Sequence, residues 1–248
     1  MPSSYKTFSL RLLAILFVFL VWKLLSLYFQ SELVLPSPEK TLQNLWQILI
    51  QSNAWKNIGF TVFRGLIALS ISMFFAIILG TLSGKYFGIK IMVHPWIVIL
   101  RSLPVISIIL LALIWFEIDN IPIFTGTLTM FPILYVQITD GLASLSPEYV
   151  EMSNVYKVSN YKKLKYLYIP TVLPHLFTGL SHAMGIGWKA IVMGEVLSLP
   201  DIAIGTRMQN AQVYLQVNEL IAWTIIAILI SFIFESIIRW LKHVFVVQ

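Results

Sequence analysis

The sequence predicts an all-α integral membrane protein, and three observations carry that prediction. Hydrophobic residues make up 58% of the 248 residues and charged residues only 11%, whereas a soluble domain carries about 25% charged residues. The mean hydropathy is +0.84. The apolar residues also gather into runs that approach or exceed about 20 residues, the helix length that crosses a bilayer. We therefore expect a single transmembrane domain over residues 1–248, with about six spans, and exclude a soluble globular fold.

The charge and the cysteine count narrow the class further. The formal net charge of +6 could suggest a nucleic-acid partner. The basic residues, however, lie in loops between apolar runs, which a cytoplasmic bias of Lys and Arg explains better. The chain has no cysteine, which excludes disulfides, thiolate metal sites and cysteine nucleophiles.

Residues 1–57 are expected to form one span and an outer amphipathic segment. The first apolar run, Leu10 to Phe29, is predicted to be a retained helix and not a signal peptide, because no small-residue cleavage site follows it. The next segment, Pro38 to Ile50, begins at a Ser-Pro-Glu sequence. One face of it carries Leu42, Leu45, Trp46, Leu49 and Ile50. Such a helix lies at the membrane interface or packs against the bundle, and both alternatives stay open.

Residues 58–241 are expected to form the core. The second span, Ile58 to Ser83, leads into glycines at four-residue spacing, which let another helix approach closely: Gly80, Gly84 and Gly88. The stretch from Gly80 to Tyr86 superficially resembles a phosphate-binding loop. It is one residue short and has Tyr where a magnesium-binding hydroxyl belongs. We therefore reject a nucleotide site and expect no cofactor, so any ATP must be bound by another subunit.

The third apolar segment, Ile89 to Phe116, is interrupted by Pro95, Arg101 and Pro104. One interpretation is a broken or re-entrant helix whose freed carbonyl groups find partners within the protein. The other, which we favour, starts the span after Pro104 and leaves Arg101 at the cytoplasmic interface. The later spans are placed at Ile121 to Ala143, Pro170 to Leu197 and Leu220 to Leu241.

A polar stretch from Ser146 to Pro174 interrupts these spans. Ser146, Pro147 and Glu148 predict a helix start, with a hydroxyl cap, a proline in the first turn and an acid near the positive end of the dipole. This helix must end near Lys157 to Asn160, where Ser159 can cap a second helix that Pro170 stops or restarts. The stretch is basic, with Lys157, Lys162, Lys163 and Lys165. Two short basic helices between spans favour a docking surface.

This stretch resembles the "EAA" loop of bacterial ABC-importer permeases. Glu151 begins the pattern, and Leu167-Tyr168-Ile169-Pro170 closes it at the family's spacing. Met152 and Ser153 replace the two alanines and Lys157 replaces the glycine. Either Lys157 adopts a left-handed conformation, at a cost of about 1 kcal/mol relative to glycine, or the turn shifts towards Asn160, which tolerates that conformation better. The resemblance implies a cytoplasmic loop, residues 146–169, that binds an ATPase through Glu148, Glu151, Met152, Ser153, Lys157, Leu167, Ile169 and Pro170.

Further motifs are similar to the nitrate, sulfonate, taurine and thiamine-precursor permeases. They are Leu35-Pro36-Ser37-Pro38, Thr61 to Gly65, Leu100 to Pro104, and Trp115-Phe116, with Glu117 where the family has glycine. The resemblance implies the type I importer (MetI-like) fold in a bacterial inner membrane, a dimer of this chain, two ATPase subunits and an extracytoplasmic substrate-binding protein. It leaves open the substrate, whether nitrate, a sulfonate or a heterocycle, and a homodimer or heterodimer.

Six spans place both termini on one side, and the basic residues indicate which side. Ten lie on the side of the termini and three on the other. The first set is Lys6, Arg11, Lys85, Lys90, Lys157, Lys162, Lys163, Lys165, Arg239 and Lys242, and the second is Lys40, Lys56 and Arg207. The side with ten is expected to be the cytoplasm.

The fifth span carries a polar stripe, because His175, His182 and Lys189 recur every seven residues. Polar side chains within a membrane usually face a bundle interior or a watery path. We therefore consider a substrate path lined by these residues and Arg101, against the alternative that they only satisfy one another. Glu195 lies off this face and is expected to be a structural or gating partner for another helix, or to neutralise Lys189 from a partner subunit.

We expect a transport subunit without its own ATPase site, and two other classes of protein are the alternatives. A secondary transporter would show two similar halves, and no internal repeat is found. A membrane-bound enzyme would need clustered acids or histidines, but His94, His175, His182 and His243 are scattered and show no metal spacing.

Overall fold

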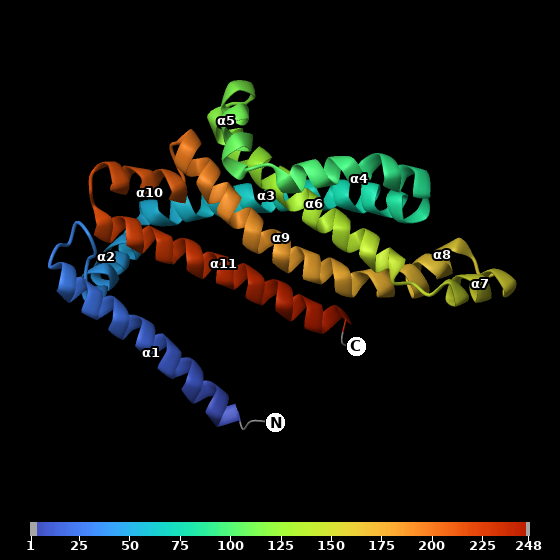
Figure 1. Cartoon of the computed structure of the whole chain (residues 1–248), viewed down its shortest axis with the longest axis horizontal. Helices are drawn as coiled ribbons and strands as arrows, with labels where there is room; N and C mark the ends of the chain where they lie inside the picture. The colour runs from blue at the N-terminus through green and yellow to red at the C-terminus, as the bar shows by residue number, and fades with distance from the viewer. Residues whose placement is uncertain (1–3, 247–248) are drawn as a thin grey trace.

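The computed structural model describes residues 4–246, within which every regular element is a helix (Figure 1). The α-helices are α1 Ser4–Phe29, α2 Pro38–Ile50, α3 Ser52–Lys85, α4 Phe87–Ser102, α5 Val105–Trp115, α6 Ile121–Ala143, α7 Pro147–Val155, α8 Asn160–Lys163, α9 Ile169–Ser198, α10 Ile204–Val213 and α11 Val217–Val246. A 3-10 turn, η1 Ile118–Asn120, precedes α6, and a π-helical turn, η2 Leu164–Tyr168, precedes α9.

The core is built where α3, α6 and α9 pack side by side, with α11 against α9. Glycines allow the close approach: a Cβ on Gly80 would lie 2.9 Å from Ile138, and one on Gly187 only 2.3 Å from Met130. The predicted close packing at Gly80 is confirmed, as it is at Gly84, whereas Gly88 faces open space. Small residues therefore set the spacing of the central helices.

Four helices are long and apolar enough to cross a membrane, namely α1, α3, α6 and α11, and the bent pair α4–α5 could supply a fifth span. The long helix α9 is less apolar because it carries prolines, histidines, Lys189 and Glu195. Its 30 residues would nevertheless extend about 45 Å, and it packs between α6 and α11. Counting α9, we infer the six spans that the sequence predicts.

The third apolar segment is broken, and the interpretation that we favoured from the sequence is wrong. Helices α4 and α5 meet at an angle of 99° across Leu103 and Pro104. The 11 residues of α5 are too few for a span of about 20 residues. Arg101 lies 14 residues beyond the start of α4, or about 21 Å along it, and not at the end where α4 begins. Proline at the break cannot donate the hydrogen bond that would continue α4.

The two N-terminal helices are joined by specific polar contacts, although α1 stands apart from the bundle (Figure 1). The Trp22 indole donates to the Pro36 carbonyl at 3.0 Å, and Lys23 Nζ lies 2.7 Å from Glu39 Oε1. The hydrogen bond from Lys23 holds the pKa of Glu39 below its ordinary value.

Helix α2 packs against the bundle, which is one of the two alternatives left open for it. Ile48 is buried and Leu45 and Leu49 pack against the core, while Leu42, Trp46 and Ile50 remain exposed. Helices α2 and α10 lie at one end of the molecule, and α7 and α8 lie at the other (Figure 1). The predicted outer and inner loops therefore occupy opposite ends. The side chains of Lys6 and Arg11, which entered the count of basic residues, fall outside the described part.

Candidate functional site

The polar loop between α6 and α9 forms as the sequence predicts. Helix α7 begins at Pro147, with Ser146 at the N-cap position and Glu148 in its first turn. The Ser146 hydroxyl does not make the predicted capping hydrogen bond. It is followed by Lys157 in the left-handed conformation, with φ of 51°. Lys163 Nζ lies 2.5 Å from the Asn154 side chain and ties α8 to α7. Of the two alternatives, the structure therefore has the left-handed residue at Lys157 and not at Asn160.

The second half of the loop is helical over the predicted range from Asn160 to Tyr168, but the chain does not stop at Pro170. Helix α8, the π turn η2 and α9 run into one another, so Pro170 lies inside a continuous helical segment that begins at Asn160. Proline lacks an N–H and clashes with the carbonyl four residues earlier in an α-helix. The wider π turn immediately before it, in which Ile169 N–H reaches the Leu164 carbonyl, accommodates the proline. Pro170 therefore does not stop the helix.

The loop presents a large uncovered surface at this end of the molecule. Of the expected coupling residues, the exposed ones are Glu148, Glu151, Met152, Lys157, Ile169 and Pro170. Leu167 is half-buried, and Ser153 is buried and donates to the Val150 carbonyl at 2.7 Å. Around them, Val155, Tyr156 and Tyr161 are each more than 70% exposed. A contiguous apolar and aromatic surface of this kind marks a contact with another protein.

On α9, one face is left uncovered by the rest of the chain. Its exposed residues are His182, Ile186, Lys189 and Met193, and a side chain at Gly185 would meet nothing within 4 Å. The spacing of three to four residues places them on one side of the helix. Within the described chain, the ammonium group of Lys189 makes no ion pair.

The other expected path residues lie elsewhere. His175 is half-buried, packs against Gly141 of α6 and lies 3.5 Å from the Ser144 hydroxyl. On the same predicted stripe, Thr178 accepts a hydrogen bond from Lys242 of α11 at 3.0 Å. Arg101 is exposed at the end of α4. The continuous polar stripe therefore divides into a packed inner part and an uncovered outer part.

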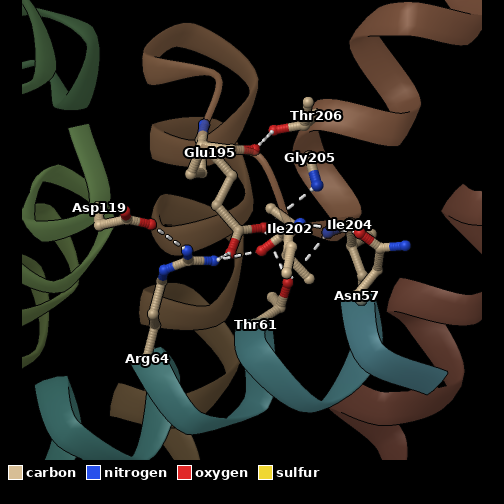
Figure 2. Close-up of polar contacts among 11 residues, drawn as sticks. Asn57, Thr61, Arg64, Asp119, Glu195, Ile202, Ile204, Gly205 and Thr206 are labelled. Carbon is tan, nitrogen blue, oxygen red and sulfur yellow. Dashed lines mark hydrogen bonds and ion pairs between the residues drawn. The ribbon is translucent and has the colours of Figure 1, made fainter. Parts of the chain in front are cut away.

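The most extensive polar site in the described chain is buried near the C-terminal end of α9 (Figure 2). Arg64 of α3 donates to Glu195 Oε1 at 3.0 Å, to the Ile202 carbonyl at 2.9 Å and to Asp119 of η1 at 2.5 Å. Glu195 is fully buried, whereas the Asp119 side chain is 73% exposed. Arg64 therefore joins α3, α9, η1 and the connection after α9.

The remaining contacts of this site hold the connection between α9 and α10. Glu195 Oε2 accepts from the Thr61 hydroxyl at 3.0 Å and from Gly205 N–H at 3.1 Å. Thr61 in turn accepts from Ile204 N–H, and Asn57 accepts from Ala203 N–H, each at 3.0 Å. Asn57, Thr61 and Arg64 form one face of α3 because they follow helical spacing. We name Arg64, Glu195, Asp119, Thr61 and Asn57 the outer latch.

The sequence reasoning found only part of this latch. The expectation that Glu195 pairs with another helix is confirmed by its contact with Arg64. The expectation that it neutralises Lys189 is wrong, because Glu195 is buried beside Arg64 and Lys189 is exposed on another face. Arg64 itself was missed, although a lone arginine within an apolar run is a signal, since a charge in a membrane needs a partner.

Among the described residues, no three His, Asp or Glu side chains converge as a metal site would require. The chemistry that the geometry offers is instead a docking surface at one end, an uncovered helix face and a buried latch near the other end.

The comparisons with known proteins identify the family. Residues 76–245 match the family described as "Binding-protein-dependent transport system inner membrane component". The chain belongs to this family.

Curated relatives of this permease support the assignment. An aliphatic sulfonates transport permease of Escherichia coli is 28% identical, with 85% of this chain and 81% of the relative covered. The taurine transport system permease of Escherichia coli is 25% identical over 97% and 89% of the two chains, and the bicarbonate transport system permease of Synechococcus elongatus is 27% identical over 70% and 63%. An inward-facing structure of the MetNI methionine ABC transporter has a TM-score of 0.54 at 15% identity, covering 75% and 92%.

These findings confirm that the chain is a permease subunit of an ABC transporter with the MetI-like fold. It is a multi-pass inner membrane protein that translocates a small solute, and ATP hydrolysis belongs to a separate subunit. Membership in a binding-protein-dependent system implies an ATPase and a binding protein as partners. The rival interpretations as a secondary transporter or a membrane enzyme are thereby set aside.

Proposed function

We propose that two copies of this permease enclose a path for a small oxyanion, with both termini in the cytoplasm. The relatives named for sulfonates, taurine and bicarbonate support this class of substrate, because each of these solutes carries an anionic oxygen group. The loop of residues 146–169 docks on the ATPase, and the α2 and α10 end receives the binding protein.

The observation that carries the proposal is the uncovered face of α9. His182 and Lys189 lie on that face with no partner from the described chain covering them. An ammonium group within a membrane is costly unless it meets water or a counter-charge. A second copy facing this side of α9 would enclose the face, and a hydrated anion moving past it would supply the counter-charge. Lys189 lies nine residues before the end of α9, about 14 Å from it, in the outer half of the span.

The loop supports the second part of the proposal. Glu151 and Met152 are exposed on α7, beside the uncovered Val155 and Tyr156. A carboxylate within an apolar surface can pair with a basic group of the ATPase, and the pair gains strength when the contact excludes water. The continuous helix from Asn160 into α9 connects this surface directly to the path.

The path is tested by Lys189→Met, with Lys56→Met as the matched control, since Lys56 is exposed but lies at the outer end of α3. Each permease is reconstituted with its ATPase and binding protein in proteoliposomes, and ATP-driven uptake of labelled taurine, ethanesulfonate and bicarbonate is measured. We expect Lys189→Met to assemble normally and to lose at least tenfold in uptake, while Lys56→Met transports normally. Wild-type uptake by Lys189→Met would eliminate the path assignment.

A further inference from the structure

A polar cavity of about 250 Å³ lies at the outer end of the permease, away from the uncovered face of α9. Its walls come from α2, the start of α3, α10 and the start of α11, and none of its lining residues belongs to α9. The lining residues are Asn44, Gln47, Ile48, Gln51, Asn53, Ala54, Asn57, Arg207, Glu219 and Trp223. The cavity shares Asn57 with the outer latch.

Two opposite charges face this cavity without neutralising each other. Arg207 of α10 and Glu219 of α11 are both half-buried, yet no ion pair within 4 Å joins either to any residue of the described chain. Glu219 accepts only the Trp223 indole N–H, at 3.2 Å. A guanidinium and a carboxylate that line one cavity but do not touch leave room for a ligand that contacts both.

The rest of the lining supplies neutral hydrogen-bonding groups. Asn44 and Gln47 lie on the polar side of α2, Gln51 follows its last residue, and Asn53 lies in the first turn of α3. Each side-chain amide offers two donors and an acceptor. Within the described chain the Asn57 amide is bonded to the backbone of Asn53 and Ala203, whereas the side-chain amides of the other four make no hydrogen bond. Such groups recognise a polar molecule and not an apolar one.

We propose that this cavity binds a small zwitterion, whose acidic oxygen atoms contact Arg207 and whose ammonium group contacts Glu219. A molecule with only one of these charges would leave the other wall unpaired, and a half-buried unpaired charge is costly. The cavity volume accommodates a two- or three-carbon aminoalkyl acid or the phosphoethanolamine group of a lipid. The inference does not depend on the path proposed for α9.

The position of the cavity allows both sources of the zwitterion. The opposite face of α2 exposes Leu42, Trp46 and Ile50, and exposed tryptophan is typical of the level of the lipid headgroups. A zwitterionic headgroup could therefore enter from the bilayer, and a free solute could enter from the outer medium.

The test uses the absence of cysteine from this chain. Asn53→Cys places a thiol in the cavity lining, and Asn210→Cys places a matched thiol on an exposed position of α10 outside it. The full chain is placed in nanodiscs of phosphatidylglycerol alone, and the rate of alkylation by a polar maleimide is measured with and without 50 mM 3-aminopropanoate or 2-aminoethanesulfonate. A dissociation constant of about 10 mM would slow the reaction about sixfold, by the factor 1 + [L]/Kd.

We expect the zwitterions to protect Asn53→Cys but not Asn210→Cys, and propanoate or ethylammonium at the same concentration to protect neither. Adding Arg207→Gln or Glu219→Gln should abolish the protection; the glutamine still offers an acceptor to Trp223. Protection in phosphatidylethanolamine nanodiscs without added solute assigns the site to the headgroup, and protection by solute alone assigns it to a free molecule. No protection by either source, or equal protection by the singly charged compounds, would overturn the proposal without needing the Arg207 or Glu219 variants to fold.

Discussion

Removing Arg64 is expected to be among the most destabilising single changes in this permease. Arg64→Met leaves the fully buried Glu195 carboxylate with only the Thr61 hydroxyl and the Gly205 N–H. Breaking a buried ion pair by removing one partner costs about 3–5 kcal/mol, because the remaining charge stays buried without compensation. Asp119→Asn removes only the partner that is 73% exposed, and exposed pairs contribute about 1 kcal/mol or less.

The two variants can be compared by thermal unfolding of the purified chain in detergent. For a chain of this size, 1 kcal/mol shifts the midpoint by about 2–4 °C. We therefore expect Arg64→Met to lower the midpoint by about 6–20 °C and Asp119→Asn by about 4 °C or less. The double variant Arg64→Met with Glu195→Gln should recover part of the loss, because it removes both charges together.

The opposite pattern would contradict the role of the latch. If Arg64→Met and Asp119→Asn lowered the midpoint equally, Arg64 would act as a surface residue. If the effects of Arg64→Met and Glu195→Gln simply added, the two side chains would not depend on each other, since contacting residues normally show coupling energies of about 0.5–3 kcal/mol.

Three further outcomes are expected. In intact cells, Asn160→Cys should resist an impermeant thiol reagent while Asn210→Cys reacts; labelling of Asn160→Cys from outside would refute the orientation. Glu151→Ala combined with Met152→Asp should reduce ATPase recruitment in a pull-down and lower uptake without changing the unfolding midpoint, and normal recruitment would remove the loop from the contact. Lys157→Gly should raise the midpoint or leave it unchanged, because the left-handed φ of 51° costs a side chain about 1 kcal/mol; a clear loss would show that the Lys157 side chain is needed in place.

Local signals in the sequence predicted the local structure well. Helix α7 starts at Pro147 with Glu148 in its first turn, and α8 starts after Ser159, because residue preferences at a helix start act over a few positions. Neither serine hydroxyl makes the predicted capping hydrogen bond. Lys157 adopts the left-handed turn at the position where the family has glycine. The basic pattern of this loop predicted a docking surface, and the family motifs added an ATPase as the expected partner.

The sequence could not predict features that depend on distant residues. Arg64 and Glu195 are 131 positions apart, and no pattern in either apolar segment predicts that the two side chains are in contact. The break between α4 and α5 was recognised as one alternative, but hydropathy alone cannot distinguish a bent pair from a span that starts late. The π turn before Pro170 was also hidden, because a proline predicts a disruption without saying whether the helix ends or widens.

The continuity through Pro170 bears on how the two ends of the permease communicate. From Asn160 to Ser198 the chain is helical throughout, with the docking loop at one end and Glu195 of the latch at the other. A hinge at Pro170 would have let the loop move without moving α9. Because the segment is continuous and Glu195 is bonded to Thr61, Arg64 and Gly205, we expect that a displacement of the loop by the proposed ATPase contact tilts α9 with the latch intact or strains the latch. Coupling of this kind requires an element that has two arrangements, with an equilibrium between them that both ends of the permease can shift. Within the latch, the contact between Arg64 and the exposed Asp119 can open at the least cost in free energy.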